Sequence, residues 1–283
     1  ADRAEPDRVI SETTTRVLDP GVAADADHTR VWGWVPVVEH HILRMRSYVR
    51  TMLITGIGSP VVYLAGLGAG LGVLVDRGKG IDGVPYLTFI APALVLAMAM
   101  QVSSQENTYG TFGGFRWSNI YNAMRLTPIS PAQMAVGSQV AVLARVLPLL
   151  AFYLVALGLF GIGTPLRLLA MLPLGMLMSV SFGFAVQAWV ATQKDDRGQM
   201  SFVERFVVVP LTLFSGTYFP LDTLPGYLQP IGWVSPLWHA TELGRWILYG
   251  QDTAVVVHLA FLVALAVVGG VLAVRHFRWR LDE

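Results

Sequence analysis

Long uncharged stretches alternate with short polar segments along most of this chain. About 20 apolar residues in an α-helix cross a bilayer core that is about 30 Å thick. The segments that fit this pattern cover about residues 52–75, 86–105, 136–160, 166–192, 202–219 and 254–274. The pattern predicts an all-α membrane protein with six transmembrane helices, in which residues 32–283 form the transmembrane domain.

The fifth predicted span is short, and an apolar stretch rich in proline follows it. Proline lacks a backbone N–H and interrupts a helix, yet this stretch is more apolar than an exposed loop. A helical hairpin that enters the outer leaflet and returns fits both properties if its backbone is buried against protein. We predict such a re-entrant hairpin over about residues 220–240; an amphipathic loop on the outer surface is the alternative. Its prolines are Pro220, Pro225, Pro230 and Pro236.

The segment before the first span differs from the rest. Residues 1–31 are polar and mixed in charge, without the continuous apolar stretch of a secretory signal, so we predict a polar cytoplasmic tail. Val38, Ile42, Met45 and Val49 then recur at helical spacing. This spacing predicts an N-terminal amphipathic helix at the membrane interface. A basic helix packed on the protein itself is an equal alternative.

Composition places the chain in the same class. Its hydrophobic fraction is 54% and its charged fraction is 14%, whereas about a quarter of the residues in soluble domains are charged. The net charge of +1 gives no general attraction to nucleic acid. The absence of cysteine excludes disulfides and cysteine nucleophiles from this chain.

Basic residues near the span ends are distributed unevenly, and cytoplasmic loops carry the excess of lysine and arginine in membrane proteins. The richer set of segments holds Arg44, Arg46, Arg50, Arg116, Arg125, Lys194, Arg197, Arg205, Arg275, Arg278 and Arg280. The opposite set holds Arg77, Lys79, Arg167 and Arg245. We therefore predict that both termini are cytoplasmic.

The longest predicted cytoplasmic connection runs over residues 106–137. Trp117, Ile120, Tyr121 and Met124 lie at helical intervals within it, and prolines follow. The pattern predicts a short helix over about residues 115–126. It would be a docking surface for a partner or, alternatively, would pack under its own spans.

Catalytic and metal-binding motifs are absent from the sequence. The lysine in the segment around Lys79 is followed by glycine, so no phosphate-binding loop is present, and the histidines lack metal-ligand spacing. Gly66 and Gly70, and likewise Gly68 and Gly72, have the spacing of close helix packing. We therefore predict that the chain is not itself an enzyme and holds no metal.

Arg145 is the clear ionisable residue inside a predicted span, which marks it as a candidate functional residue. It would face a substrate path, pair with Glu106 or Glu204, or extend its charge to the headgroups. A secondary transporter would need further intramembrane charges or internal repeats, which we do not find. An intramembrane lipid-modifying enzyme is the remaining alternative, with an outer-face site of Asp222, His239 and Glu242.

Three segments carry a family resemblance: "QENTYGTF", "RWSNIYNAMRLTPISPAQMAVG" and "LFSGTYFPLDTLPGYLQPIGWVSPLWHATELGRWILYG". The most specific pattern is S-G-x-x-F-P followed by L-P and P-L-x-H, from Ser215 to His239. The chain resembles the permease subunits of type-2 ATP-binding-cassette exporters, in the branch of nodulation-factor and drug-resistance exporters. The resemblance covers most of the chain after about Trp32.

The resemblance implies a permease homodimer or heterodimer in a bacterial inner membrane, working with two copies of a separate ATPase that holds ATP and Mg²⁺. No cofactor is implied on this chain. The implied cargo is an amphipathic or lipid-like substrate, such as a drug, an antibiotic, a glycolipid or a lipid-linked saccharide. Our candidates for the ATPase-coupling surface are Glu106, Arg116, Trp117, Asn119 and Arg125. Those for the substrate path are Arg145, Phe214, Tyr218 and Phe219.

Overall fold

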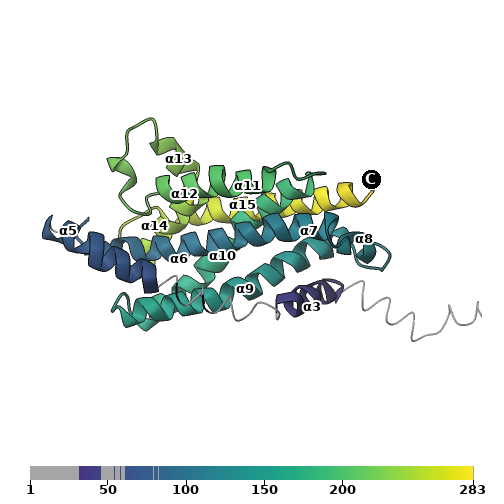
Figure 1. Ribbon diagram of the computed structural model, residues 1–283. Coiled ribbons are helices and arrows are strands. Elements are labelled where there is room, and N and C mark those ends of the chain that lie inside the picture. The colour runs from purple at the N-terminus through teal and green to yellow at the C-terminus, as the bar shows by residue number, and fades with distance from the viewer. Residues whose placement is uncertain are drawn as a thin grey trace, which may run out of the picture.

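The computed structural model describes residues 32–45, 54, 58, 61–78, 80, 81 and 83–282. In this part of the chain the helices run side by side in an elongated bundle (Figure 1). We call the end with α8 and the C-terminal turn of α15 the α8 end, and the end with α13 the α13 end. The predicted tail 1–31 and the first residues of the first predicted span, 52 and 53, lie outside the described residues.

Five described helices are long and apolar enough to cross a membrane, and they match five of the six predicted spans. They are 61–78, which includes η2 (Gly68–Gly72), α5 (Val73–Val75) and η3 (Asp76–Gly78); 86–116, which begins with α6 (Tyr86–Gln105); α9 (Pro131–Leu159); α10 (Pro165–Ala191); and α15 (Val255–Asp282). The all-α prediction is confirmed.

Local signals explain where two of these helices begin. Asp76 accepts a hydrogen bond from the backbone N–H of Tyr86 at 2.8 Å, which satisfies one of the free donors at the start of α6. Ser130 and Gln133 exchange side-chain and backbone hydrogen bonds of 3.2 and 2.8 Å, and Pro131 occupies the first turn. This capping box fixes the start of α9.

The second predicted span is longer than the sequence indicated. The helix does not end at Gln105 but continues through a π-helical segment, η4 (Glu106–Gly110), and then α7 (Thr111–Arg116). The uncharged residues after Glu106 extend the helix, so the connection to α9 is shorter than predicted.

The prediction of one continuous helix over about residues 115–126 is wrong. The chain breaks between α7 and α8 (Ile120–Met124), where Asn119 adopts a left-handed backbone with φ of 50°. The reason is packing, because α8 folds back on α7. A Cβ on Gly114 would lie 2.2 Å from the Tyr121 ring, so only glycine admits this approach.

The fifth predicted span begins and ends earlier than expected. α11 (Gln199–Val203), η5 (Glu204–Val208) and α12 (Val209–Phe214) follow one another without a break, and the helix stops at Ser215 and Gly216, whose φ is 72°. These 16 residues span about 24 Å at 1.5 Å per residue. The segment is shorter than a bilayer core and is not one of the five spanning helices.

The proline-rich stretch divides into short helices, as its prolines predict. Pro220 precedes η6 (Leu221–Thr223), Pro225 accepts a turn hydrogen bond from the N–H of Leu228, and Pro230 and Pro236 lie in the first turns of α13 (Gln229–Val234) and α14 (Pro236–Tyr249). Proline suits these positions because a first-turn N–H has no helical partner. α14 continues well past residue 240 and packs on α6, α10 and α15.

α3 (Trp34–Met45) packs lengthwise on α9 at the lower edge of the bundle (Figure 1). Val37 is fully buried there, and a Cβ on Gly137 would lie 2.8 Å from the Cβ of Val37. The contact face is thus centred on Val37, whereas Ile42 is exposed. The side chain of Met45, and Val49, lie outside the described residues. The helix therefore packs on the protein and also presents an apolar outer face.

The glycine pairs of the first span behave differently from one another. A Cβ on Gly68 would lie 3.1 Å from the Leu87 side chain, so this glycine does serve close packing against α6. Gly66 and Gly70 face open space instead. Among the described residues, close packing is therefore seen at Gly68, and Gly66 and Gly70 have no neighbour within 4 Å.

Replacement of Gly269 by alanine is expected to destabilise the bundle by about 1–3 kcal/mol. The added Cβ would lie 3.0 Å from the backbone nitrogen of Ala185 in α10, and backbone cannot move aside as a side chain can. Gly270→Ala is the matched control, because its Cβ would meet only the Phe184 ring, at 3.4 Å. Thermal unfolding of both purified variants checks this, and equal melting temperatures would contradict it.

Candidate functional site

Aromatic side chains hold α8 in place at the α8 end of the bundle. The rings of Phe115, Tyr121 and Phe277 meet pairwise at centroid distances of 4.8–5.2 Å. All three are buried, together with Met134 and Leu281. This cluster joins α7, α8, α9 and α15. A displacement of α8 would therefore be transmitted to the long helices α9 and α15.

Exposed charges surround this cluster. Arg116 forms an ion pair of 2.7 Å with Asp195, in the connection between α10 and α11, and Arg125 lies 3.9 Å from Asp282 at the end of α15. Exposed pairs of this kind contribute about 0–1 kcal/mol. They orient the connecting segments at this end more than they stabilise it.

Four of the five predicted coupling residues lie at this exposed end: Arg116, Trp117, Asn119 and Arg125. Trp117 is 61% exposed, and the edge of its ring meets Phe112 with the centroids 5.6 Å apart. Glu106 does not belong to this exposed group, because it lies earlier in the same helix, at the start of η4.

Glu106 and Arg145 form an ion pair between η4 and α9, and both side chains are half-buried. This confirms one of the partners proposed for Arg145. The other proposed partner, Glu204, instead accepts a hydrogen bond of 2.7 Å from Ser104. The pair neutralises two charges in the interior of the bundle, where an unpaired charge would be costly.

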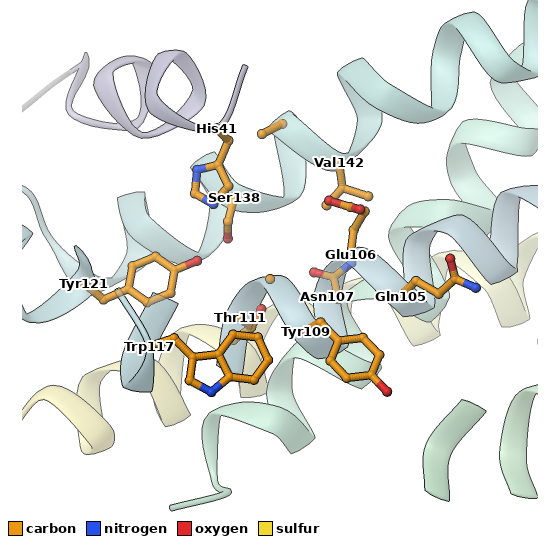
Figure 2. A pocket seen from close by; sticks show the side chains of 12 residues that line it. His41, Gln105, Glu106, Asn107, Tyr109, Thr111, Trp117, Tyr121, Ser138 and Val142 are labelled. Carbon is orange, nitrogen blue, oxygen red and sulfur yellow. The ribbon is translucent and has the colours of Figure 1, made fainter. Parts of the chain in front are cut away.

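A cavity of about 190 Å³ lies next to this pair and is bounded by α3, η4, α7, α8 and α9. We call it the η4 cavity. Figure 2 shows His41, Asn107, Tyr121 and Ser138 around its centre, with Trp117 on one side and Val142 on the other. Polar and aromatic groups therefore line a space that opens beside the predicted coupling residue Trp117.

The remaining predicted path residues lie elsewhere. Phe214 ends α12, and Tyr218 and Phe219 lie in the bend that follows, all of them half-buried. Arg145 lies beside η4 instead. The structure therefore places the four predicted path residues in two separate regions.

Arg245 is a buried residue that the sequence reasoning missed, because it counted this arginine among the outer surface cations. Its side chain is 2% exposed, lies 2.9 Å from Glu242 and 2.5 Å from the carbonyl of Gly216, and stacks 3.8 Å above the Phe89 ring. The spacing of Glu242 and Arg245, three residues apart on a helix, was the available signal. Arg245 joins α14 to α6 and to the end of α12.

Two residues of the alternative enzyme site, His239 and Glu242, have other partners. His239 contacts His258 at 2.8 Å between the two Nδ1 atoms and donates from Nε2 to the carbonyl of Trp233 at 3.0 Å. Glu242 pairs with Arg245. In the part of the chain that the structure describes, His, Asp and Glu form no group of three suited to a metal ion.

Comparison with known proteins gives the family. The family model described as ABC-2 type transporter matches residues 39–249. Nodulation protein J of Rhizobium meliloti (strain 1021) is 29% identical over 252 residues, covering 88% of this chain and 94% of that protein. The protein of the same name from Rhizobium leguminosarum bv. viciae is also 29% identical, over 88% of this chain and 95% of its own length.

A further similarity is to a permease of Escherichia coli (strain K12), the probable multidrug ABC transporter permease YbhR. It is 26% identical over 188 residues, which are 64% of this chain and 49% of that protein. Since the family model spans most of the chain, from the middle of α3 to the end of α14, this protein belongs to the ABC-2 type transporter family, as a multi-pass membrane permease that is a non-catalytic subunit.

Proposed function

We propose that this permease exports an amphipathic or lipid-like substrate from the cytoplasm or the inner leaflet of a bacterial inner membrane. A separate ATPase would bind ATP and Mg²⁺ and supply the energy. Family membership supports this function, and the similar E. coli permease is described as a probable multidrug ABC transporter permease. The proposed cargo is a drug, an antibiotic, a glycolipid or a lipid-linked saccharide. Membrane lipid would surround the permease.

The topology we propose has six spans, with residues 199–214 as a short fifth span. The segment from η6 to the start of α14 would complete that crossing as a re-entrant hairpin in the outer leaflet. Its short helices and their packing against α12 and α14 support this arrangement. Both termini would be cytoplasmic, because Arg116, Arg125, Arg278 and Arg280 lie at the α8 end.

The single observation that carries the mechanism is the unbroken helix from Tyr86 to Arg116, which ends in the exposed Trp117. ATP binding would close two ATPase copies on the α8 end. Because α7 continues directly into η4 and α6, a push on Arg116, Trp117, Asn119 and Arg125 would reach the middle of the bundle as a rigid-body movement. Glu106 would receive that movement through η4 and pass it to Arg145.

A permease dimer is part of this proposal. Gly66 and Gly70 face open space on the first span, and glycine at this spacing lets a second helix approach closely. Phe214, Tyr218 and Phe219, at the α13 end, would border the path between the two copies. Both a homodimer and a heterodimer satisfy this arrangement.

Affinity purification of the permease from its native membrane tests the function. We expect an ATPase to copurify in two copies per permease dimer and to hydrolyse ATP when Mg²⁺ is present. The mass of the complex would also identify the dimer as homomeric or heteromeric. A permease that purifies alone after gentle extraction would contradict the coupling mechanism.

A further inference from the structure

The last two turns of α15 have two unlike faces. On the inner face, Phe277 is buried in the aromatic cluster, and Arg280 donates to the carbonyl of Gln193 at 2.6 Å. Arg275 and Arg278 lie three residues apart, which places them side by side on the outer face, and both are exposed. In the part of the chain that the structure describes, neither of these two arginines takes part in a hydrogen bond or an ion pair. Two guanidinium groups of α15 are therefore available to a ligand.

The outer face of α15 is apolar before it becomes basic. Val268 and Val271 are 56% and 61% exposed, and helical spacing places them on the same side of α15 as the two arginines. Residues 255–274 contain no Asp, Glu, Lys or Arg, and these 20 residues of helix extend about 30 Å, the thickness of a bilayer core. Arg275 and Arg278 therefore lie where the hydrocarbon ends, at the level of the lipid head groups.

A tryptophan and a lysine extend the basic face. Trp279 is 44% exposed, and the centroid of its ring lies 5.5 Å from the Nζ of Lys194. Lys194 is exposed and comes from the connection between α10 and α11. Tryptophan is enriched in membrane proteins at the level of the head groups, which fits the position of Trp279 next to the arginines. We call Lys194, Arg275, Arg278 and Trp279 the α15 basic patch.

Two acidic side chains adjoin the patch in the sequence, and each pairs with an arginine outside the patch. Asp282 lies 3.9 Å from Arg125, and Asp195 forms an ion pair of 2.7 Å with Arg116. The patch therefore keeps its positive charge. A guanidinium binds a phosphate through two parallel hydrogen bonds, and a lysine ammonium attracts it as a point charge. These groups fit a phosphate of net negative charge that lies in the plane of the head groups.

We propose that the α15 basic patch binds the head group of an anionic phospholipid in the leaflet at the α8 end. The apolar face favours lipid over an acidic partner protein, because a bound phospholipid also brings acyl chains that cover Val268 and Val271. This lipid is a resident of the site and not cargo, so the inference goes beyond the proposed function. Lys194 precedes Asp195, which pairs with Arg116 of the proposed coupling surface. The bound lipid would hold this connection in place beside that surface.

Native mass spectrometry of the full-length permease in detergent tests the proposal, by titration with dioleoyl phosphatidylglycerol or dioleoyl phosphatidylcholine. The two lipids have the same acyl chains and one phosphate each, but only the first has a net negative charge. We expect the wild type to bind phosphatidylglycerol more tightly by roughly tenfold or more, and this preference should shrink as ionic strength rises. A variant that combines Arg275→Gln with Arg278→Gln should bind phosphatidylglycerol more weakly by roughly tenfold and phosphatidylcholine as before.

Arg77→Gln combined with Arg167→Gln is the matched control, because it removes two exposed arginines at the opposite end of the bundle. It should bind phosphatidylglycerol as the wild type does. Only variants that elute as wild type in size-exclusion chromatography are compared, and the ionic-strength series on the wild type needs no variant.

Equal binding of the two lipids by the wild type would overturn the proposal, as would an equal loss in the control variant. Unchanged phosphatidylglycerol binding in the Arg275 and Arg278 variant would overturn it as well. If that variant instead loses a copurifying ATPase, the patch contacts an acidic partner protein. The lipid titration needs neither ATPase nor cargo, so its failure is distinguishable from a failure of the proposed function.

Discussion

Replacement of Arg245 by methionine is expected to destabilise the permease by about 3–5 kcal/mol, because it leaves Glu242 buried without its cation. The carbonyl of Gly216 loses its charged donor as well, and Phe89 loses the cation above its ring. Methionine keeps most of the side-chain volume, so the loss is electrostatic. Thermal unfolding of the purified protein should show a melting temperature lower by roughly 10 °C.

Arg167→Met is the matched control for this change. Arg167 lies at the same end of the bundle, is exposed, and donates one hydrogen bond of 2.8 Å to the carbonyl of Leu248. Its loss should cost about 1 kcal/mol. A further variant that combines Arg245→Met with Glu242→Leu should recover part of the stability. Equal effects of Arg245→Met and Arg167→Met would show that the buried contacts of Arg245 do not carry the stability.

Replacement of Trp117 by alanine is expected to leave folding intact and to remove coupling. The ring is 61% exposed, and a tryptophan at the centre of a protein interface contributes about 2 kcal/mol or more to binding. The amount of ATPase that copurifies without added substrate should therefore fall by roughly tenfold or more. Transport in reconstituted vesicles should fall with it.

Trp233→Ala controls for the loss of an exposed tryptophan. Trp233 is 52% exposed in α13, at the opposite end of the bundle (Figure 1), and should retain the ATPase. The melting temperatures of both variants should stay close to that of the wild type. If Trp117→Ala copurifies as much ATPase as Trp233→Ala does, Trp117 does not belong to the coupling surface.

Hydropathy predicted the spans well because bilayer thickness sets both the length and the composition of a spanning helix. The ends of α9 and α10 lie within a few residues of their predicted bounds, since Pro131 and Pro165 also mark helix starts locally. The extension of α6 through η4 was not predictable in this way. A charged residue such as Glu106 usually marks the end of a span. Here the helix continues through Glu106, because Arg145, 39 residues further along the chain, pairs with its charge.

The candidate residues were recovered unevenly. Glu106 was one of two partners considered for Arg145 from their charges, and the exposed group around Trp117 was proposed from its aromatic and basic character. Arg245 was missed, because its three-residue spacing from Glu242 does not by itself distinguish a buried pair from an exposed one. Its importance comes from burial and from a partner, Gly216, that is distant in the sequence.

The sequence by itself determined the membrane class, the positions of the long helices, the proline-divided stretch and the family, because these follow from local composition and short motifs. Only the tertiary structure decided that α8 folds back on Gly114, that Arg245 is buried and that the helix of α6 continues past Glu106. The physical reason is that close packing and hydrogen bonding join residues far apart in the chain. Local patterns cannot encode such contacts.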